Sequence, residues 1–188
     1  MNSTNKIKLI YGIGNDDERY SYSFHNIGKE IVKYFFEKPS SLKYAQYQKY
    51  NKHLILATNT NYMNECGKGL RELSKEFKIT PSSILIIHDD ADLSFPLFKI
   101  SFNKNSAGHK GIESIINHLK TKKFWRFRIG IQKKQRQQAI DIVLNKMNNR
   151  EKELMNKKIK PKFKIILDKL ASGYLPNELN IAKNFFLS

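Results

Sequence analysis

The pattern of apolar and polar positions alternates between short apolar runs and stretches with helical spacing. Residues 84–87, and residues 8–13 after the initial Lys8, are apolar runs of the length that a buried strand needs. Between residues 63 and 77, apolar side chains recur every three or four positions, which is the spacing of an amphipathic helix. Because strands alternate with helices along the chain, the pattern predicts an α/β fold with a largely parallel sheet.

The remaining elements follow from the same periodicities. Further strands are expected around residues 44–47, 53–57, 97–102 and 124–131. Further helices are expected over residues 26–37, after the polar loop 103–108, over 139–147, over 154–158 and over 177–186. Between the last two, Pro161 suits the first turn of one more helix, and Gly173 suits its C-terminal cap.

Composition adds a strong and uneven positive charge. The chain has 188 residues and a net charge of +17, and we expect residues 1–188 to form one domain with a basic helical part from about residue 146. Residues 1–98 hold 13 basic and 11 acidic side chains, whereas residues 99–170 hold 20 and 5. A general preference for lysine would also raise the charge of the first half, where acids balance it. The excess therefore indicates a polyanionic partner such as a nucleic acid.

Several classes of protein are disfavoured. The single cysteine, Cys66, allows neither a disulfide framework nor a zinc site built on cysteines. No apolar run reaches the ~20 residues of a membrane span, and a first strand from about Lys8 is expected to leave no room for a cleavable targeting segment. Gly12 and Gly14 lack the third glycine of a dinucleotide fingerprint. We therefore expect no cofactor, no bound metal and no membrane partner.

The most suggestive chemistry follows the apolar run at 84–87. His88, Asp89, Asp90 and Asp92 come directly after it, so a buried strand delivers an imidazole and three carboxylates to its C-terminal end. Ligands collect at that end of the strands in open α/β sheets. A second imidazole, His25, lies far upstream, and a carboxylate beside an imidazole can orient it as a general base. The alternative is a set of solvated acids at a junction between strand and loop.

Six short motifs call for one explanation. In chain order they are Gly12-Ile13-Gly14-Asn15, His25-Asn26, Tyr62-Met63-Asn64, His88-Asp89-Asp90-Ala91-Asp92-Leu93, Gly108-His109-Lys110-Gly111 and Arg126-Phe127-Arg128-Ile129-Gly130-Ile131. Each is weak alone. In this order and at these intervals, over roughly residues 7–145, they resemble the bacterial-type peptidyl-tRNA hydrolases.

The resemblance implies a monomeric three-layer α/β/α sandwich with a mixed, mostly parallel twisted sheet. It also implies cleavage of the ester that joins a peptide to the 3′ ribose of tRNA. The family's catalytic histidine falls on His25 and its orienting aspartate on Asp89. Its substrate-binding residues fall on Asn15, Tyr20 and Asn64.

These residue types suit ester hydrolysis. A neutral imidazole can take a proton from water at physiological pH, and the amides of Asn15 and Asn64 can donate hydrogen bonds to a carbonyl oxygen that becomes negative. One such donor can contribute ~3 kcal/mol. Because an alcohol is a good leaving group, direct attack by water is favoured over a covalent intermediate.

The sequence departs from the family pattern at two places near these motifs. Lys110 stands where the family has a third asparagine, and it can hold a carbonyl or a phosphate but cannot accept a hydrogen bond. We count it among the substrate-binding residues. The family's Asn-Pro-Gly turn reads Asn15-Asp16-Asp17 here. Both changes leave His25 and Asp89 in place.

The expected tRNA contacts lie in the basic half of the chain. The family's phosphate-binding arginine falls on Arg128, but Ser101 stands at the position of its lysine. Lys99 and Lys104 are near enough in sequence to replace that lysine. The basic segment 146–170 either extends this surface or is a solvated helix face.

Three functions are compared. An active peptidyl-tRNA hydrolase that recycles tRNA accounts for all the motifs, whereas a catalytically weak RNA-binding relative in a ribonucleoprotein would account for Lys110 and the basic C-terminal part. A hydrolase of small esters lacks a nucleophile elbow and leaves the charge unexplained. We expect a monomer in the cytoplasm, with the mitochondrial matrix as the alternative and association with the ribosome left open.

Overall fold

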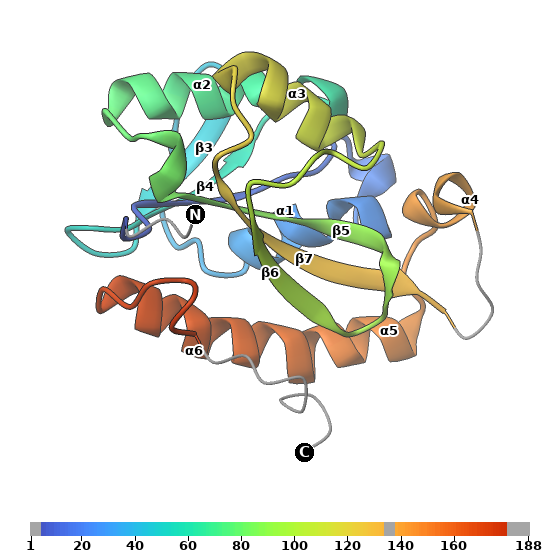
Figure 1. Cartoon of the computed structure of the whole chain (residues 1–188). Coiled ribbons are helices and arrows are strands. Elements are labelled where there is room, and N and C mark those ends of the chain that lie inside the picture. Colours follow the sequence, from blue (N-terminus) through green and yellow to red (C-terminus); the bar gives the residue numbers. More distant parts are fainter. Residues whose placement is uncertain (1–4, 134–137, 180–188) are drawn as a thin grey trace.

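A seven-stranded sheet forms the centre of the molecule (Figure 1). The computed structural model describes residues 5–133 and 138–179. The strand order is β2-β3-β4-β1-β5-β7-β6. The strands are β1 (Leu9–Gly12), β2 (Ser40–Ser41), β3 (Ala45–Lys49), β4 (Ile55–Asn59), β5 (Ile84–Ser94), β6 (Phe98–Phe102) and β7 (Trp125–Gln132). The four central strands, β4, β1, β5 and β7, run parallel, and the outer strands pair antiparallel.

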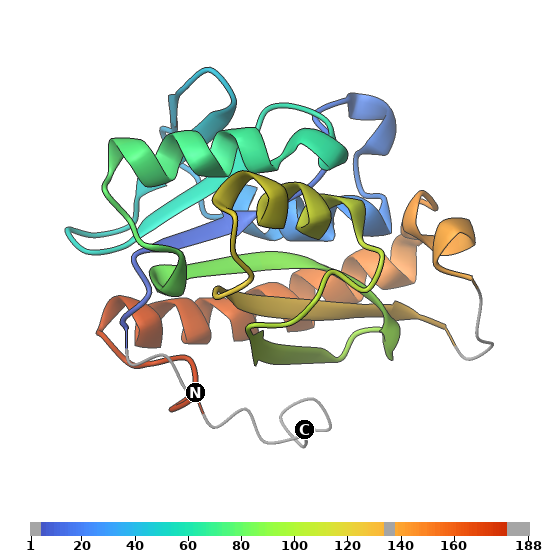
Figure 2. The same ribbon diagram turned by 45° about the horizontal axis from the view of Figure 1, so that its top comes forward.

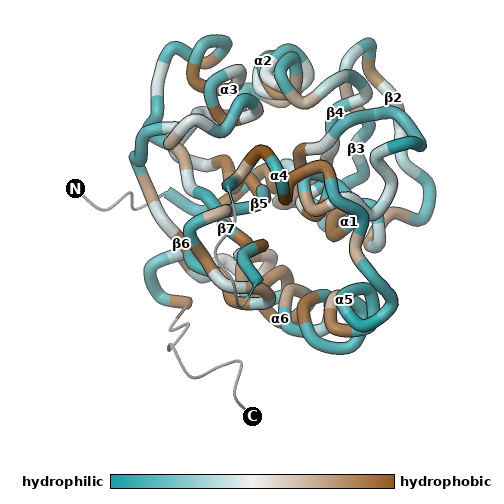
Figure 3. The backbone as a smooth tube through the Cα atoms, turned by 90° about the vertical axis from the view of Figure 1, so that its right-hand side faces the viewer, coloured by the Kyte–Doolittle hydropathy of each residue, from teal (hydrophilic) through white to brown (hydrophobic). Residues whose placement is uncertain are grey.

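Helices cover both faces of this sheet, as Figures 1 and 3 show. They are α1 (Ile27–Lys33), α2 (Gly67–Glu76), α3 (Lys110–Leu119), α4 (Ala139–Val143), α5 (Asn149–Leu154) and α6 (Lys160–Ala171). A π-helical stretch, η5 (Met155–Ile159), joins α5 to α6. The described residues also form the short 3₁₀ turns η1 (Glu18–Tyr20), η2 (Phe24–Asn26), η3 (Met63–Glu65) and η4 (Pro81–Ser83). Helices α2 and α3 pack on one face, and α1, η5 and α6 on the other. The expected three-layer α/β/α fold with a mixed sheet is confirmed.

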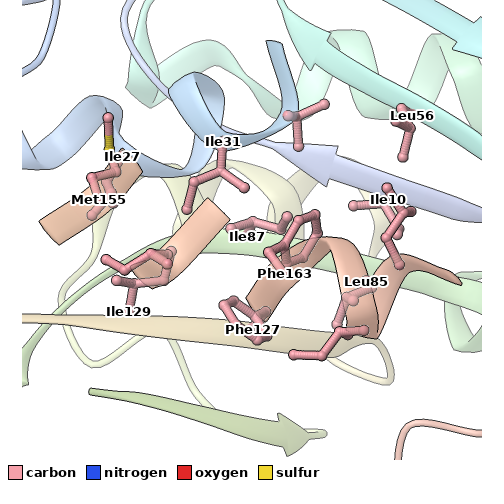
Figure 4. Packing of buried hydrophobic residues seen from close by; sticks show 14 of the residues in the cluster. Ile10, Ile27, Ile31, Leu56, Leu85, Ile87, Phe127, Ile129, Met155 and Phe163 are labelled. Carbon is pink, nitrogen blue, oxygen red and sulfur yellow. The ribbon is translucent and has the colours of Figure 1, made fainter. Parts of the chain in front are cut away.

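The core lies on both faces of the sheet. On the face of α1 and α6, Ile31 and Phe163 meet Ile87 and Phe127 of the central strands (Figure 4). The rings of Phe127 and Phe163 pack edge to face, with 5.4 Å between their centroids. Each such side chain is fully buried and contributes about 2 kcal/mol to folding. Cys66 lies in the core of the opposite face, as its place on the apolar stripe predicts.

Strand β5 is longer than the apolar run at 84–87 predicts. It continues to Ser94, because β7 pairs with it as far as Asp90 and again at Ser94, with a register shift between. His88, Asp89 and Asp90 therefore belong to the strand rather than to a loop after it. Acidic residues are poor strand formers, but pairing with a neighbouring strand outweighs this preference.

The C-terminal part is helical, as expected, but its boundaries differ. Helix α4 ends at Val143 rather than near residue 147. The chain then runs helically from Asn149 to Ala171, with a proline in the first turn of α6. Gly173 follows with a φ of +96°, the left-handed backbone that favours glycine at a helix end. Most of the helix expected over 177–186 lies outside the described residues. Among the described helices, none is long and apolar enough to cross a membrane.

Two glycines allow α1 to lie directly against the sheet. A Cβ atom on Gly28 would come within 2.1 Å of the carbonyl oxygen of Ile87, and one on Gly12 within 2.3 Å of the carbonyl oxygen of Gly28. No larger residue fits at either position without moving the helix. This close approach brings the turn before α1, which holds His25, next to the middle of β5.

Candidate active site

The polar residues of the six motifs gather at one end of the sheet. Figure 2 shows the loop after β1, the start of α3 and α4 at this end. Turn η2 presents His25, strand β5 presents Asp89, and His109 precedes α3. In open α/β sheets, ligands bind beyond the carboxyl ends of the parallel strands, and this is such an end.

Asp89 holds two imidazoles. His25 Nδ1 lies 3.0 and 3.1 Å from the two carboxylate oxygens, and His109 Nε2 lies 2.9 Å from Oδ1. The Asp89 side chain is only 2% exposed, whereas those of His25 and His109 are 13% and 11% exposed. The structure thus contains the contact expected between His25 and Asp89, which lie 64 positions apart.

The hydrogen bonds fix where the protons sit on both rings. His109 Nδ1 accepts from the backbone N–H groups of Gly111 and Ile112 at 3.1 and 3.4 Å, so the proton of the neutral ring is on Nε2 and is donated to Asp89. His25 likewise donates its Nδ1–H to Asp89. The lone pair of His25 is then on Nε2, which has no partner among the described residues. That atom is free to take a proton from a ligand.

Asp89 also determines the charge state of the site. Burial lowers the pKa of His25, but the negative charge of Asp89 and its hydrogen bond outweigh burial and raise this pKa above its ordinary value. Burial raises the pKa of Asp89, but the two histidines outweigh it and hold this pKa well below its usual range. The neighbouring His88 is neutral, because burial and His109 depress its pKa. The carboxylate is therefore ionised whenever His25 is neutral.

His25, Asp89 and His109 also place possible metal ligand atoms within 4.8 Å of one another, a grouping found among the described residues that the sequence did not reveal. A metal on His109 Nε2 would need the lone pair there and would move the proton to Nδ1. On Nδ1 the proton would oppose the N–H groups of Gly111 and Ile112. The bonding therefore fits a proton-bearing network better than a metal site.

Asn15 links the loop after β1 to two other segments. Its backbone N–H donates to Asn26 Oδ1 at 2.7 Å, and Asn26 Nδ2 donates to its carbonyl at 2.9 Å. Its own Oδ1 accepts the N–H of Met63 at 2.8 Å. The amide Nδ2 of Asn15 then has no partner among the described residues and is free to donate. Because Asn26 follows His25 and Met63 precedes Asn64, this one residue joins three of the motifs.

The other predicted substrate-binding residues are less fixed. Asn64 is exposed in η3, and Tyr20 is half-buried in η1. Neither side chain forms a hydrogen bond to another described residue. Lys110 is the first residue of α3, and its side chain is 71% exposed. Its Nζ lies 3.1 Å from Oε2 of Glu113. The roles expected of these three residues stay predictions.

The predicted tRNA-binding residues lie at the β6 edge. Lys99 of β6 stands directly opposite Arg128 of β7 in the antiparallel register, and Lys104 is exposed in the loop that follows. The guanidinium of Arg128 pairs with the carboxylate of Asp90. Ser101 is buried opposite Arg126. The exposed positive charge of this edge is therefore carried by the two lysines and, in part, by Arg128.

Sequence reasoning missed two groups of supporting residues. His109 was noted only as part of a motif, although its ring is the second donor to Asp89. Asn26 and Asn59 both hold the loop after β1, and Asn59 Nδ2 donates to the carbonyl of Gly14 at 2.6 Å. The position of Asn26 directly after His25 was the only available signal.

Comparisons with known proteins agree with this geometry. The family model described as peptidyl-tRNA hydrolase matches residues 9–184. A peptidyl-tRNA hydrolase of Lactobacillus helveticus is 36% identical over 93% of this chain and 100% of its own length, and one of Sulfurihydrogenibium is 34% identical over 89% and 93%. The crystal structure of peptidyl-tRNA hydrolase from Acinetobacter baumannii superposes with a TM-score of 0.78 at 26% identity, covering 93% of both chains. The chain belongs to the peptidyl-tRNA hydrolase family.

Proposed function

We propose that His25 is the general base of this peptidyl-tRNA hydrolase and that Asp89 orients it. The observation that carries this proposal is the bond from His25 Nδ1 to a buried carboxylate, which leaves Nε2 free. A base with this arrangement takes a proton from water as the water oxygen attacks the ester carbonyl carbon. Asp89 stabilises the imidazolium that forms.

The remaining steps use the proton now on His25. The tetrahedral intermediate collapses by breaking the bond between the carbonyl carbon and the ribose oxygen. His25 Nε2–H returns its proton to that oxygen, which gives tRNA with a free 3′ hydroxyl. The peptide carboxylic acid that forms at the same time releases its own proton to solvent and leaves as a carboxylate. The free Nδ2 of Asn15 donates to the developing oxyanion, and Asn64 and Tyr20 bind the substrate beside it. These steps need only water as co-reactant.

A direct assay tests the proposal. Purified protein is mixed with an N-blocked aminoacyl-tRNA that is labelled on the amino acid, and release of the label is followed over time. We expect multiple turnovers and a product tRNA that can be charged again. Binding of the same tRNA without release of the label would instead favour the catalytically weak RNA-binding relative.

The basic β6 edge supports binding of the tRNA backbone by Lys99, Lys104 and Arg128. We expect affinity for deacylated tRNA to fall steeply with salt, because each phosphate contact releases counterions. Lys99→Ala should weaken binding several-fold and flatten the log–log salt slope by about 0.9. Lys49 is the matched control, since it is exposed on β3 at the other side of the sheet. A flat salt plot for the unmodified protein would contradict this surface.

Lys110 is expected to be tolerated in the site. Its ammonium group pairs with Glu113 on the exposed side of α3, and such surface pairs contribute at most about 1 kcal/mol. Lys110→Asn should therefore change kcat by less than about threefold, measured in the same label-release assay. Lys120→Asn at the exposed far end of the helix is the control. A gain of an order of magnitude in Lys110→Asn alone would show that the lysine impairs catalysis.

We further propose that the chain acts as a single-domain monomer in the cytoplasm. The relatives named above are bacterial proteins, which supports this location over the mitochondrial matrix. The basic helical segment from about residue 146 is the surface that we would test first for contact with ribosomal RNA.

A further inference from the structure

Lys29 is a buried charged group that the reaction does not use. Its side chain is 4% exposed, and its ammonium group pairs with the carboxylate of Asp16. Burial lowers the pKa of Lys29, and the bond to Asp16 partly offsets this. A lysine is almost never this buried unless it is paired. The pair lies between the first helix and the loop after β1, close to Asn15.

Lys29 holds that loop at two points on either side of Gly14 and Asn15. Its backbone N–H donates to the carbonyl of Ile13 at 3.1 Å, and its side chain reaches Asp16. The loop is pressed onto the helix between these points, since a Cβ atom on Gly14 would come within 2.9 Å of Lys29 Cβ. Lys29 therefore bonds the loop both before Asn15, at Ile13, and after it, at Asp16.

Asp16, the exposed member of the pair, is also bonded to the segment before η3. The backbone N–H of Asp16 donates to the carbonyl of Asn61 at 3.2 Å, and Asn61 lies in the segment that leads to Met63. Met63 in turn donates to Asn15 Oδ1. The Lys29–Asp16 pair thus restrains the residue that follows Asn15, in addition to the bonds from Asn26 to Asn15 itself.

We propose that Lys29 is a positioning residue, which acts through Asp16 to hold the amide of Asn15 toward the reacting carbonyl. The inference rests on the role of Asn15 proposed above. Lys29 itself touches neither substrate nor His25. In the turn Asn15-Asp16-Asp17, Asp16 is the residue that makes an ion pair across to the helix possible.

A double-mutant cycle tests this role. Lys29→Met is combined with Asn15→Ala, and kcat is measured for all four proteins well below their unfolding temperatures. We expect Lys29→Met to lower kcat about tenfold in the otherwise unmodified protein and less than about twofold in the Asn15→Ala background, because residues of one hydrogen-bond and salt-bridge network couple by such amounts. Lys33→Met, an exposed lysine one turn along the helix, should have no effect in either background.

The outcomes separate this inference from the proposed mechanism. Equal losses in both backgrounds, or no loss in the first, would overturn the positioning role of Lys29. Full activity of Asn15→Ala would instead contradict the catalytic role of Asn15. The positioning role of Lys29 would then be tested by hydrogen exchange at the backbone N–H of Met63, which donates to Asn15 Oδ1. We expect that N–H to exchange faster in Lys29→Met and that of Ile87 to be unchanged; unchanged exchange at Met63 would overturn it.

A second variant covers the case in which Lys29→Met does not fold. Asp16 is exposed, and Asp16→Asn keeps its size while it removes the negative charge. Asp16→Asn should lower kcat in the otherwise unmodified protein but not when it is combined with Asn15→Ala. An undiminished loss there would overturn the inference as well.

Discussion

Replacing His25 by alanine is expected to lower kcat/KM by about 10²–10⁴-fold, the usual contribution of a general base. The free Nε2 of His25 is the proton acceptor of the proposed reaction, and alanine offers no substitute. Affinity for tRNA should stay within about twofold, because His25 is a part-buried side chain bonded to Asp89 and the phosphate contacts are assigned to Lys99, Lys104 and Arg128. Label release from N-blocked aminoacyl-tRNA gives kcat/KM, and filter binding of deacylated tRNA gives the affinity.

A matched histidine controls for general effects of the substitution. His53 is exposed in the turn before β4, and His53→Ala should leave both quantities unchanged. Circular dichroism of both variants shows whether the fold is kept. If His25→Ala retained the turnover of the unmodified protein, His25 would not be the base, and the role of Asp89 would lose its basis too.

Much of the fold follows from local patterns. The apolar run at 84–87 forms a central strand because both faces of the sheet are covered, so continuous apolar side chains are favoured there. Residues 124–131 also form a central strand, although Arg126 and Arg128 interrupt their apolar side chains. The spacing from Met63 to Phe77 gives α2 because its apolar stripe packs against the sheet. The extension of β5 to Ser94 was missed because it depends on pairing with β7 forty residues later, which local propensity does not encode.

The site was predictable from motif order but not from local chemistry. His25 and Asp89 meet because Gly28 lets α1 approach the carbonyl oxygen of Ile87, and nothing near either residue in the sequence announces that contact. The second imidazole on Asp89 and the ion pair of Lys29 with Asp16 were missed for a related reason. Each joins a loop to a different element, so its detection requires the packing of those elements.

Asp89→Asn is expected to lower kcat/KM by about 10²-fold at its optimum, because it removes the carboxylate that stabilises the imidazolium. His25 and His109 both donate to Oδ1 of Asp89, and His25 Nδ1 also lies 3.1 Å from Oδ2. The NH2 group of an asparagine would therefore face the N–H of His25 in either orientation of the amide. The proton of His25 is then no longer held on Nδ1, and Nε2 loses its role as acceptor in part of the molecules.

The same substitution should move the acidic limb of the pH profile. The active form of His25 is neutral, so activity falls as the pH drops through its pKa, which Asp89 raises above the ordinary value. In Asp89→Asn the negative charge is gone and burial remains, so this pKa falls and the limb shifts to lower pH. Asp92→Asn, an exposed acid on the same strand, should leave the limb in place. A limb that stays put or moves upward in Asp89→Asn would show that another group titrates, because loss of an adjacent negative charge can only make a histidine easier to deprotonate.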